Sequence, residues 1–223
     1  MKRAILALLL TLGCAACAST AHQDLTWPTA SQLVPGVTTE AQILAEYGQP
    51  DARATTTDTY DASQNAQATG TVFDVPPVPG SSTFLSYSAR GAWGPLLGRP
   101  AASRALFLRI WNGTLVSYAY VSNFDADTTD FDPARANQLV RGGSTEADAI
   151  RMLGTPSGRA VYPSVRDPNT DAFIYQYAKP EGRQIFQKRL ELVFGVDGKL
   201  IDYRLTNNLV DLGPLPPLRV FVY

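Results

Sequence analysis

The residue types that most enzymes depend on are scarce in this chain. His22 is the single histidine among 223 residues, and both cysteines, Cys14 and Cys17, lie near the N-terminus. Histidine is the usual base beside a nucleophile and the commonest zinc ligand. Phosphate-loop, dinucleotide-binding and nucleophile-elbow motifs are absent from the sequence as well. We therefore expect a non-enzymatic protein that uses no cofactor.

Two acidic clusters are candidate metal sites. Asp167-x-Asn169-x-Asp171 opens like a calcium loop, but Ala172 replaces the turn glycine and Ala178 replaces the bidentate glutamate. The second cluster is the run Asp125, Asp127, Asp130 and Asp132. Spaced carboxylates in a linker are usually solvated, with a weak divalent site as the alternative. Any two acids could also form a glycosidase-like pair, but the sequence singles out none. We predict no metal site.

The balance of charge argues against a nucleic-acid partner. The chain has 19 Lys and Arg against 20 Asp and Glu, a net charge of −1. Removal of a leader that holds Lys2 and Arg3 leaves 17 basic residues and a net charge of −3. Such a chain has no basic excess with which to neutralise phosphates.

The N-terminus has the features of a secretory leader. Lys2 and Arg3 precede an apolar run at residues 4–12, which is too short to span a bilayer. The end of this run, Leu10-Thr11-Leu12-Gly13-Cys14, resembles a bacterial lipobox, which implies cleavage before a cysteine that becomes lipidated. Gly13 favours Cys14 over Cys17 as that residue. The alternative is an ordinary leader with both cysteines discarded or paired, although a bridge between them would be strained.

A lipid on Cys14 would anchor the chain stably, because several acyl chains bind a membrane far better than one. Ala16 is not the aspartate that resembles an inner-membrane retention signal, so we expect the periplasmic face of the outer membrane. The small and polar residues up to about Thr29 predict a tether.

One motif occurs twice, at residues 33–50 and 139–156, with a constant spacing of 106. Such self-similarity predicts an internal duplication. Each copy predicts a short helix that starts at Thr38 or Thr39, and at Ser144 or Thr145. The expected apolar faces are Ile43, Leu44 and Tyr47, and Ala149, Ile150 and Leu153. The shared motif residues are Gly36, Gly48, Pro50, Gly142, Gly154 and Pro156; Gly48 and Gly154 are expected to form left-handed C-terminal caps, and each proline to stop its helix.

This motif resembles the core of the SmpA/OmlA family, the small outer-membrane lipoproteins of the BamE type, in which Pro-Gly-Met/Val-Thr precedes a helix and Leu-Gly-x-Pro follows it. The chain departs from that pattern at Tyr47 and at Arg141-Gly142-Gly143. Two copies in tandem resemble the layout of the beta-lactamase inhibitory protein fold. The resemblance implies an α+β fold of two repeats, each a short helix or helix pair on an antiparallel sheet of three or more strands.

Turn residues and alternation divide the rest of the chain. We predict loops at residues 51–82, 90–102 and 159–171, short strands at 84–87 and 172–178, and hairpins at 105–121 and 185–206. In the first hairpin, the return strand should carry Val116, Tyr118 and Tyr120 on one face. Their counterparts in the second hairpin, at a spacing of 85, are Ile201, Tyr203 and Leu205. The outgoing arms match at a spacing of 84, which predicts one extra residue near the second turn.

These elements give the expected domain limits. They are a signal peptide at 1–13, a lipidated tether at 14–32, a first repeat with long inserted loops at 33–124, an acidic connector at 125–136, a second repeat at 137–207, and a Pro-rich tail at 208–223 that could add an edge strand.

The expected function is binding. Phe73 and the loop residues Trp93, Leu96 and Leu97 are candidate partner contacts, since aromatic groups on loops often carry recognition. The alternative is that both loops cover the sheet. The resemblance implies an accessory of outer-membrane protein assembly or envelope integrity that contacts barrel-assembly components or another envelope protein. The alternative function is an inhibitor or binding module for a periplasmic hydrolase.

Overall fold

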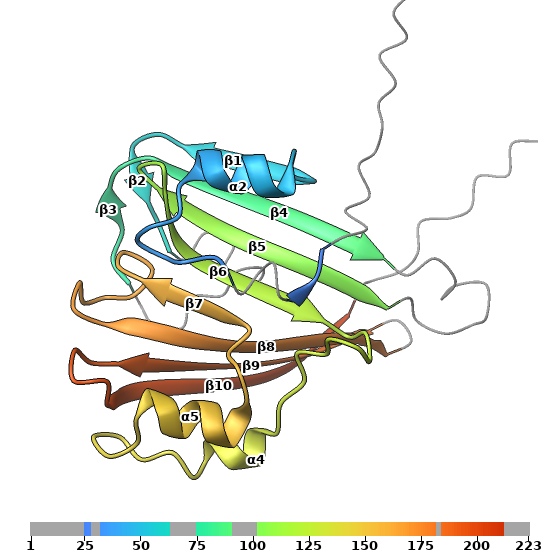
Figure 1. The fold of residues 1–223 in the computed structure, drawn as a ribbon, viewed down its shortest axis with the longest axis vertical. Helices are drawn as coiled ribbons and strands as arrows, with labels where there is room; N and C mark the ends of the chain where they lie inside the picture. Colours follow the sequence, from blue (N-terminus) through green and yellow to red (C-terminus); the bar gives the residue numbers. More distant parts are fainter. Residues whose placement is uncertain (1–24, 28–31, 63–74, 91–101, 182–183, 212–223) are drawn as a thin grey trace, which may run out of the picture.

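One antiparallel sheet dominates the computed structural model, which describes residues 25–27, 32–62, 75–90, 102–181 and 184–211. Its eight strands, in spatial order, are β1 (Ala52–Thr56), β4 (Ser82–Arg90), β5 (Ser103–Trp111), β6 (Thr114–Ser122), β7 (Gly158–Val161), β8 (Asp171–Glu181), β9 (Gln184–Phe194) and β10 (Leu200–Asp211). A separate pair is formed by β2 (Thr59–Tyr60) and β3 (Val78–Pro79). The helices of this part are α2 (Glu40–Tyr47), α4 (Pro133–Ala136) and α5 (Glu146–Leu153) (Figure 1).

The predicted α+β class is wrong, because the described chain is mostly sheet and its two halves share that sheet. The first half contributes α2, β1, β4, β5 and β6, and the second half contributes α4, α5, β7, β8, β9 and β10. Strand β6 pairs directly with β7, so the sheet continues from one half into the other. Backbone hydrogen bonding, which a sequence pattern does not report, is what joins the halves.

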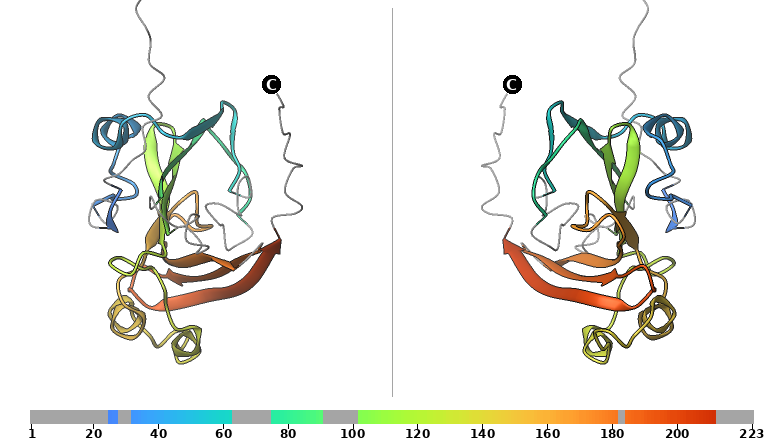
Figure 2. Two further views of the ribbon diagram at one scale, coloured as in Figure 1. Left: turned by 90° about the vertical axis from the view of Figure 1, so that its right-hand side faces the viewer. Right: turned by 90° about the vertical axis from the view of Figure 1, so that its left-hand side faces the viewer.

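Helices α2, α4 and α5 lie on the same side of a bent sheet (Figure 2). Beneath α2 is a core that includes Ile43, Leu85, Leu106, Leu108 and Leu115. The second half has an equivalent core under α4 and α5, with Ala149, Phe173, Leu190, Leu192 and Leu200 among its members. Each helix is therefore held by an apolar stripe of the half to which it belongs. No helix among the described residues is long and apolar enough to cross a membrane.

The predicted helix starts are confirmed, and the cap is the second of the two candidate residues in each copy. Thr39 and Thr145 each accept a hydrogen bond from the backbone N–H of the third helical residue, and the side chain of that residue returns to the cap. The predicted apolar face is confirmed for α2. In α5 one member is wrong, because Ile150 is 39% exposed while Met152 packs on the core with Leu153.

Several predicted loops contain strands. The stretch 51–82 includes β1, β2 and β3, and the expected short strand at 84–87 is the nine-residue β4. The predicted loop at 159–171 begins with β7, and the acidic connector contains α4. Strand β10 extends past the expected limit at 207 to Asp211. Residues 91–101 of the other predicted loop, and most of the tail, lie outside the described residues.

Both predicted hairpins are confirmed, but one predicted face is wrong. Leu115, Tyr118 and Tyr120 line the helix-side core, whereas Val116 packs with Tyr60 on the opposite face. A bulge in β6 causes this, because the register shifts opposite Arg109 and Ile110. The same shift occurs in β10 around Ile201. The second turn is also one residue longer than the first, as predicted: five residues separate Phe194 from Leu200, and four separate Ile110 from Leu115.

Candidate interaction surfaces

The residues predicted to bind a membrane or a partner lie outside the described residues. Cys14, Phe73, Trp93, Leu96 and Leu97 all belong to that group. The six motif residues, by contrast, are described, and they hold the helices onto the sheet.

The glycine that opens each motif ties the helix to a hairpin. Gly36 donates its N–H to the Leu115 carbonyl at 2.7 Å, and Gly142 donates to the Leu200 carbonyl at the same distance. The backbone at Thr38 accepts the Leu115 N–H, just as Ser144 accepts the Leu200 N–H, both at 2.8 Å. The two halves therefore repeat the same local structure bond for bond.

The glycine that ends each helix adopts a conformation other than the one predicted. Gly48 has φ 73° and ψ −152°, and Gly154 has φ 85° and ψ −173°. The positive φ was expected, but the extended ψ places both outside the left-handed helical region and in one that is essentially reserved for glycine. This geometry turns the chain sharply towards Pro50 and Pro156, which lie two residues before the starts of β1 and β7.

The joint between the halves is short and tightly packed. It consists of three residue pairs, Ser117 with Ala160, Tyr118 with Arg159, and Ala119 with Gly158. A Cβ on Gly158 would lie 2.2 Å from the Tyr118 carbonyl oxygen, so only glycine fits there. Next to these pairs, the Tyr120 N–H donates to the Ser157 carbonyl at 2.8 Å.

A groove of about 400 Å³ lies over this joint on the helix side of the sheet. Val34 and Pro35 of the first half face Ile150 and Pro156 of the second half across it, with Tyr118 and Arg159 also lining it. Burial raises the pKa of Asp171, which also lines the groove, although Arg159 opposes that shift. Burial and the Asp171 charge raise the pKa of Glu146. The guanidinium thus lies near two carboxyl groups that ionise with difficulty.

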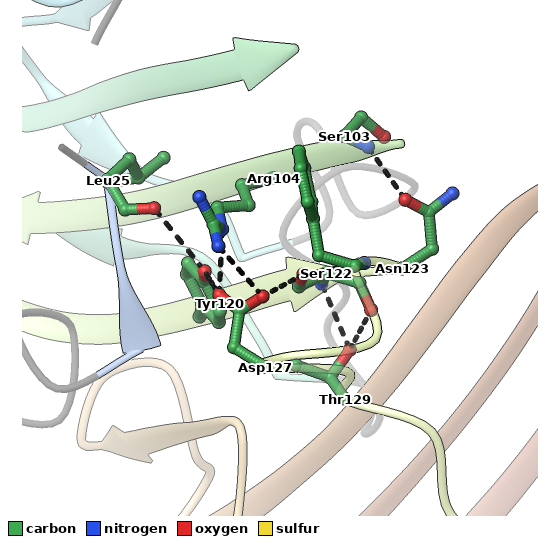
Figure 3. Close-up of polar contacts among 9 residues, drawn as sticks. Leu25, Ser103, Arg104, Tyr120, Ser122, Asn123, Asp127 and Thr129 are labelled. Carbon is green, nitrogen blue, oxygen red and sulfur yellow. Dashed lines mark hydrogen bonds and ion pairs between the residues drawn. The ribbon is translucent and has the colours of Figure 1, made fainter. Parts of the chain in front are cut away.

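The side chain of Asp127 holds the connector against the first half through Arg104, Tyr120 and Ser122, a set of contacts that we call the latch (Figure 3). Its carboxylate accepts two hydrogen bonds from Arg104, at 2.8 and 3.1 Å, and further bonds from the hydroxyls of Tyr120 and Ser122 at 2.5 and 3.0 Å. Burial acts to raise the pKa of Asp127, but these donors outweigh it and hold the pKa below its ordinary value. Thr129 continues the latch into the second half by donating to the Gln176 carbonyl at 2.6 Å.

Three aspartates of the acidic run make contacts within the protein. Besides the latch, Asp132 caps α4 by accepting the Ala134 N–H at 2.9 Å, and Asp130 forms an ion pair with Lys188. Asp167 accepts the Asn169 N–H at 2.9 Å, which closes its own turn. Within the described ranges, no three His, Cys, Asp or Glu side chains come together as a metal site would require.

A buried ion pair lies on the face of the sheet opposite the helices. Arg189 of β9 donates to Glu191, which is 1% exposed, and to the side chain of Gln176. The other carboxylate oxygen of Glu191 has no partner among the described groups. Burial raises the pKa of Glu191 despite the opposing charge of Arg189.

The second half has an equivalent of the surface with which the first half binds β7, and no described strand covers it. Val140, Arg141 and Tyr203 occupy the positions that Val34, Pro35 and Tyr118 occupy in the first half. No described strand pairs with the outer edge of β10. Tyr203 is partly exposed, whereas its counterpart Tyr118 is 5% exposed. Val140 is 62% exposed against 50% for Val34, and Ile201, the bulge residue of β10, is 49% exposed.

Sequence reasoning missed this surface, although the signal was present. The match of Tyr118 to Tyr203 at a spacing of 85 was recognised, but only as a property of the hairpins. Its meaning depends on which strand of each half has a neighbour, and that is visible only in the sheet order.

Comparison with known proteins adds little. No family model matches the chain, so the resemblance to SmpA/OmlA lipoproteins gains no support, and no curated protein matches either. A structural match was found to the crystal structure of a "putative beta-lactamase inhibitor protein" from Streptococcus mutans, with 12% identity, a TM-score of 0.38, and coverage of 76% of this chain and 82% of that one. A TM-score of that size establishes neither a common fold nor a common function.

Proposed function

We propose that this chain is a non-enzymatic, lipid-anchored envelope protein that binds another protein through the outer edge of β10 and the loop beside it. The observation that carries the proposal is the outer edge of β10, with which no described strand pairs. Val140, Arg141 and Tyr203 flank this edge on the helix side of the sheet, and the bulge residue Ile201 flanks it on the opposite face. Its equivalent in the first half binds a strand and a helix end of the second half. A surface that forms a stable protein joint in one half is suited to form one in the other.

The location in this proposal rests on the sequence. The leader and the lipobox around Cys14 support export and lipidation, and an outer-membrane partner such as a barrel-assembly component suits the resemblance stated above. Inhibition of a periplasmic hydrolase is the second candidate. It would use the same exposed surface, so the identity of the partner distinguishes the two.

Photo-crosslinking in living cells tests the proposal. A photoreactive phenylalanine replaces Ile201 on the β10 edge, and the control replaces Val37, a 70% exposed residue of the first half. We expect a discrete adduct from position 201 alone, and we expect Arg141→Glu to abolish it. A barrel-assembly subunit in that adduct supports the accessory role, and a hydrolase supports inhibition. Equal labelling from both positions, or no adduct from position 201, would contradict the proposal.

A further inference from the structure

The geometry points to an extended segment of a partner protein as the occupant of the β10 edge, added to β10 as β7 is added to β6. The segment carries glycine at the position equivalent to Gly158 and an acidic side chain at the next position. This inference rests on the proposed function, because it specifies the partner of the same surface. The pairing of β7 with β6 defines the register in which the segment would pair with β10. The residues that differ between the edges of β6 and β10 define which segment would bind.

The register follows from the equivalence of β6 and β10. The pairs Tyr118 with Arg159 and Ala119 with Gly158 transfer to Tyr203 and Arg204 of β10. In an antiparallel ladder every second pair exchanges hydrogen bonds. Because the Tyr120 N–H points towards β7, the N–H groups of Tyr203 and Leu205 point to the outer edge. An incoming strand would bond to these two groups.

The requirement for glycine follows from how closely the internal strands approach. At the internal joint a Cβ in place of Gly158 would collide with the Tyr118 carbonyl oxygen. The carbonyl of Tyr203 occupies the same place in β10. An occupant with the same register therefore needs glycine opposite Arg204.

The requirement for an acidic side chain follows from Arg141, which replaces Pro35 at this position. Its guanidinium lies 5.0 Å from the centre of the Tyr203 ring and forms an ion pair with Asp202 at 2.5 Å. The Asp202 carboxylate also accepts the Tyr203 N–H at 2.9 Å, which covers the edge while no strand is bound. An incoming carbonyl would take over that N–H and displace the carboxylate. An acidic residue opposite Tyr203 would then take its place beside Arg141.

A second copy of this chain is a poor occupant by the same criteria. Its free strand β1 would present Ala52 where glycine is needed and Arg53 where Arg141 favours an acid. Charged residues on an edge strand commonly prevent pairing between copies, which could otherwise continue without limit. Ala52, Arg141 and Asp202 therefore favour a different protein.

Capped peptides test the inference on the full chain as the cell produces it, in detergent. The probe is Ser-Gly-Glu-Ala-Val-Tyr, and its variants have Arg for Glu, Ala for Gly, or an N-methyl group on Glu. We expect the probe to slow amide exchange at Tyr203 and Leu205. The Arg peptide should bind at least about threefold more weakly, since exposed charge pairs contribute little. The Ala and N-methyl peptides should bind at least about fivefold more weakly, from a clash and a lost hydrogen bond.

Two protein variants complete the design. Arg141→Glu should reverse the preference between the Glu and Arg peptides, and Asp202→Ser, which restores the Ser117 of the first half, should strengthen binding of the probe. Failure of the probe to protect either amide, equal binding of the Ala peptide, or an unchanged preference in Arg141→Glu would overturn the inference. Concentration-dependent chains of the wild-type protein in sedimentation would also overturn it, in favour of a second copy. If the position-201 adduct persists while the peptides fail, this inference falls and the proposed function stands.

Discussion

The hydroxyl of Tyr175 donates a hydrogen bond of 3.0 Å to the carbonyl of Gly154, the residue that ends α5. Tyr87 makes the same contact with Gly48 at the end of α2, at 3.1 Å. Burial raises the pKa of both phenols, that of Tyr87 to about 12, so each remains a donor at physiological pH. Strands β4 and β8, which pair with β1 and β7 in the sheet, thus support the two glycine turns.

Removal of these hydroxyls should weaken each half separately. Tyr87→Phe and Tyr175→Phe each leave a glycine carbonyl without its donor, so each should lower the free energy of unfolding by about 0.5–1.5 kcal/mol. The effects should be additive in the double variant, because the sites share no contacts. Urea unfolding measures them, with Tyr177→Phe as the control. A negligible loss would show that the hydroxyls are dispensable.

Gly158→Ala should open the joint between the halves. The new Cβ would meet the Tyr118 carbonyl at 2.2 Å, and the resulting backbone shift should cost about 1–3 kcal/mol or more. The reciprocal control is Ala52→Gly, which meets no such contact and should cost only about 0.5–1 kcal/mol through chain entropy. Thermal unfolding measures the stability cost of Gly158→Ala and of Ala52→Gly. Amide exchange at β6 shows in which of the two variants the joint has opened. Equal costs would contradict the geometry of the joint.

Asp127→Asn should destabilise the latch in a pH-dependent way. At pH 7 the loss of the charged acceptor for Arg104 and Tyr120 should cost about 1–3 kcal/mol. The folded state lowers the pKa of Asp127, so its contribution is complete above the unfolded value of about 3.9 and disappears as the pH falls through the folded value. The gap between wild type and variant should therefore close as the pH falls below about 3.9. Denaturant titrations at several pH values test this, and the exposed Asp125→Asn is the control.

Glu191→Gln should have the opposite pH dependence. The raised pKa means that the folded state holds this proton more firmly than the unfolded chain does. Wild-type stability therefore falls as the pH rises from about 4.3, the unfolded value, through the folded pKa. Glutamine can still accept from Arg189 but has no proton to lose, so the variant should gain relative to wild type as the pH rises above about 4.3. A parallel pH profile for the two proteins would contradict this, and Glu181→Gln is the surface control.

Cys14→Ala should abolish the incorporation of radioactive palmitate in growing cells, because only the cysteine after the cleavage site receives lipid. Cys17→Ala should leave labelling intact. Full labelling of Cys14→Ala, with loss from Cys17→Ala, would move the cleavage site by three residues and contradict the proposed anchor.

The sequence predicted those features that depend on neighbours along the chain. Thr39 and Thr145 cap helices because side-chain oxygens reach backbone donors three residues ahead, and Asn112-Gly113 forms a turn because both residues accept positive φ. The helix limits and both hairpins followed from such local chemistry. The doubled motif also identified equivalent residues in the two halves correctly.

Features that depend on distant partners could not be predicted in this way. Strands β1 and β7 are short and mix the strand-favouring Thr and Val with Ala, Arg and Gly, so propensity alone does not identify them. Their pairing with β4, β6 and β8 determines that they are strands. The bulge that turns Val116 away from Tyr118 leaves no mark in the alternation. The exposed Tyr203 edge depends on the absence of a neighbouring strand among the described elements, which is a property of the whole sheet.

The three-pair joint between β6 and β7 also determines how the molecule comes apart. Strands β8 and β9 are held by eleven residue pairs, so the joint between β6 and β7 is the more weakly paired of the two. Local opening should begin there and release each half with its own helix and core still folded, which gives two cooperative units rather than one. Two chains opened at this joint could then exchange halves by domain swapping. Prolonged storage at high concentration should therefore favour domain-swapped dimers.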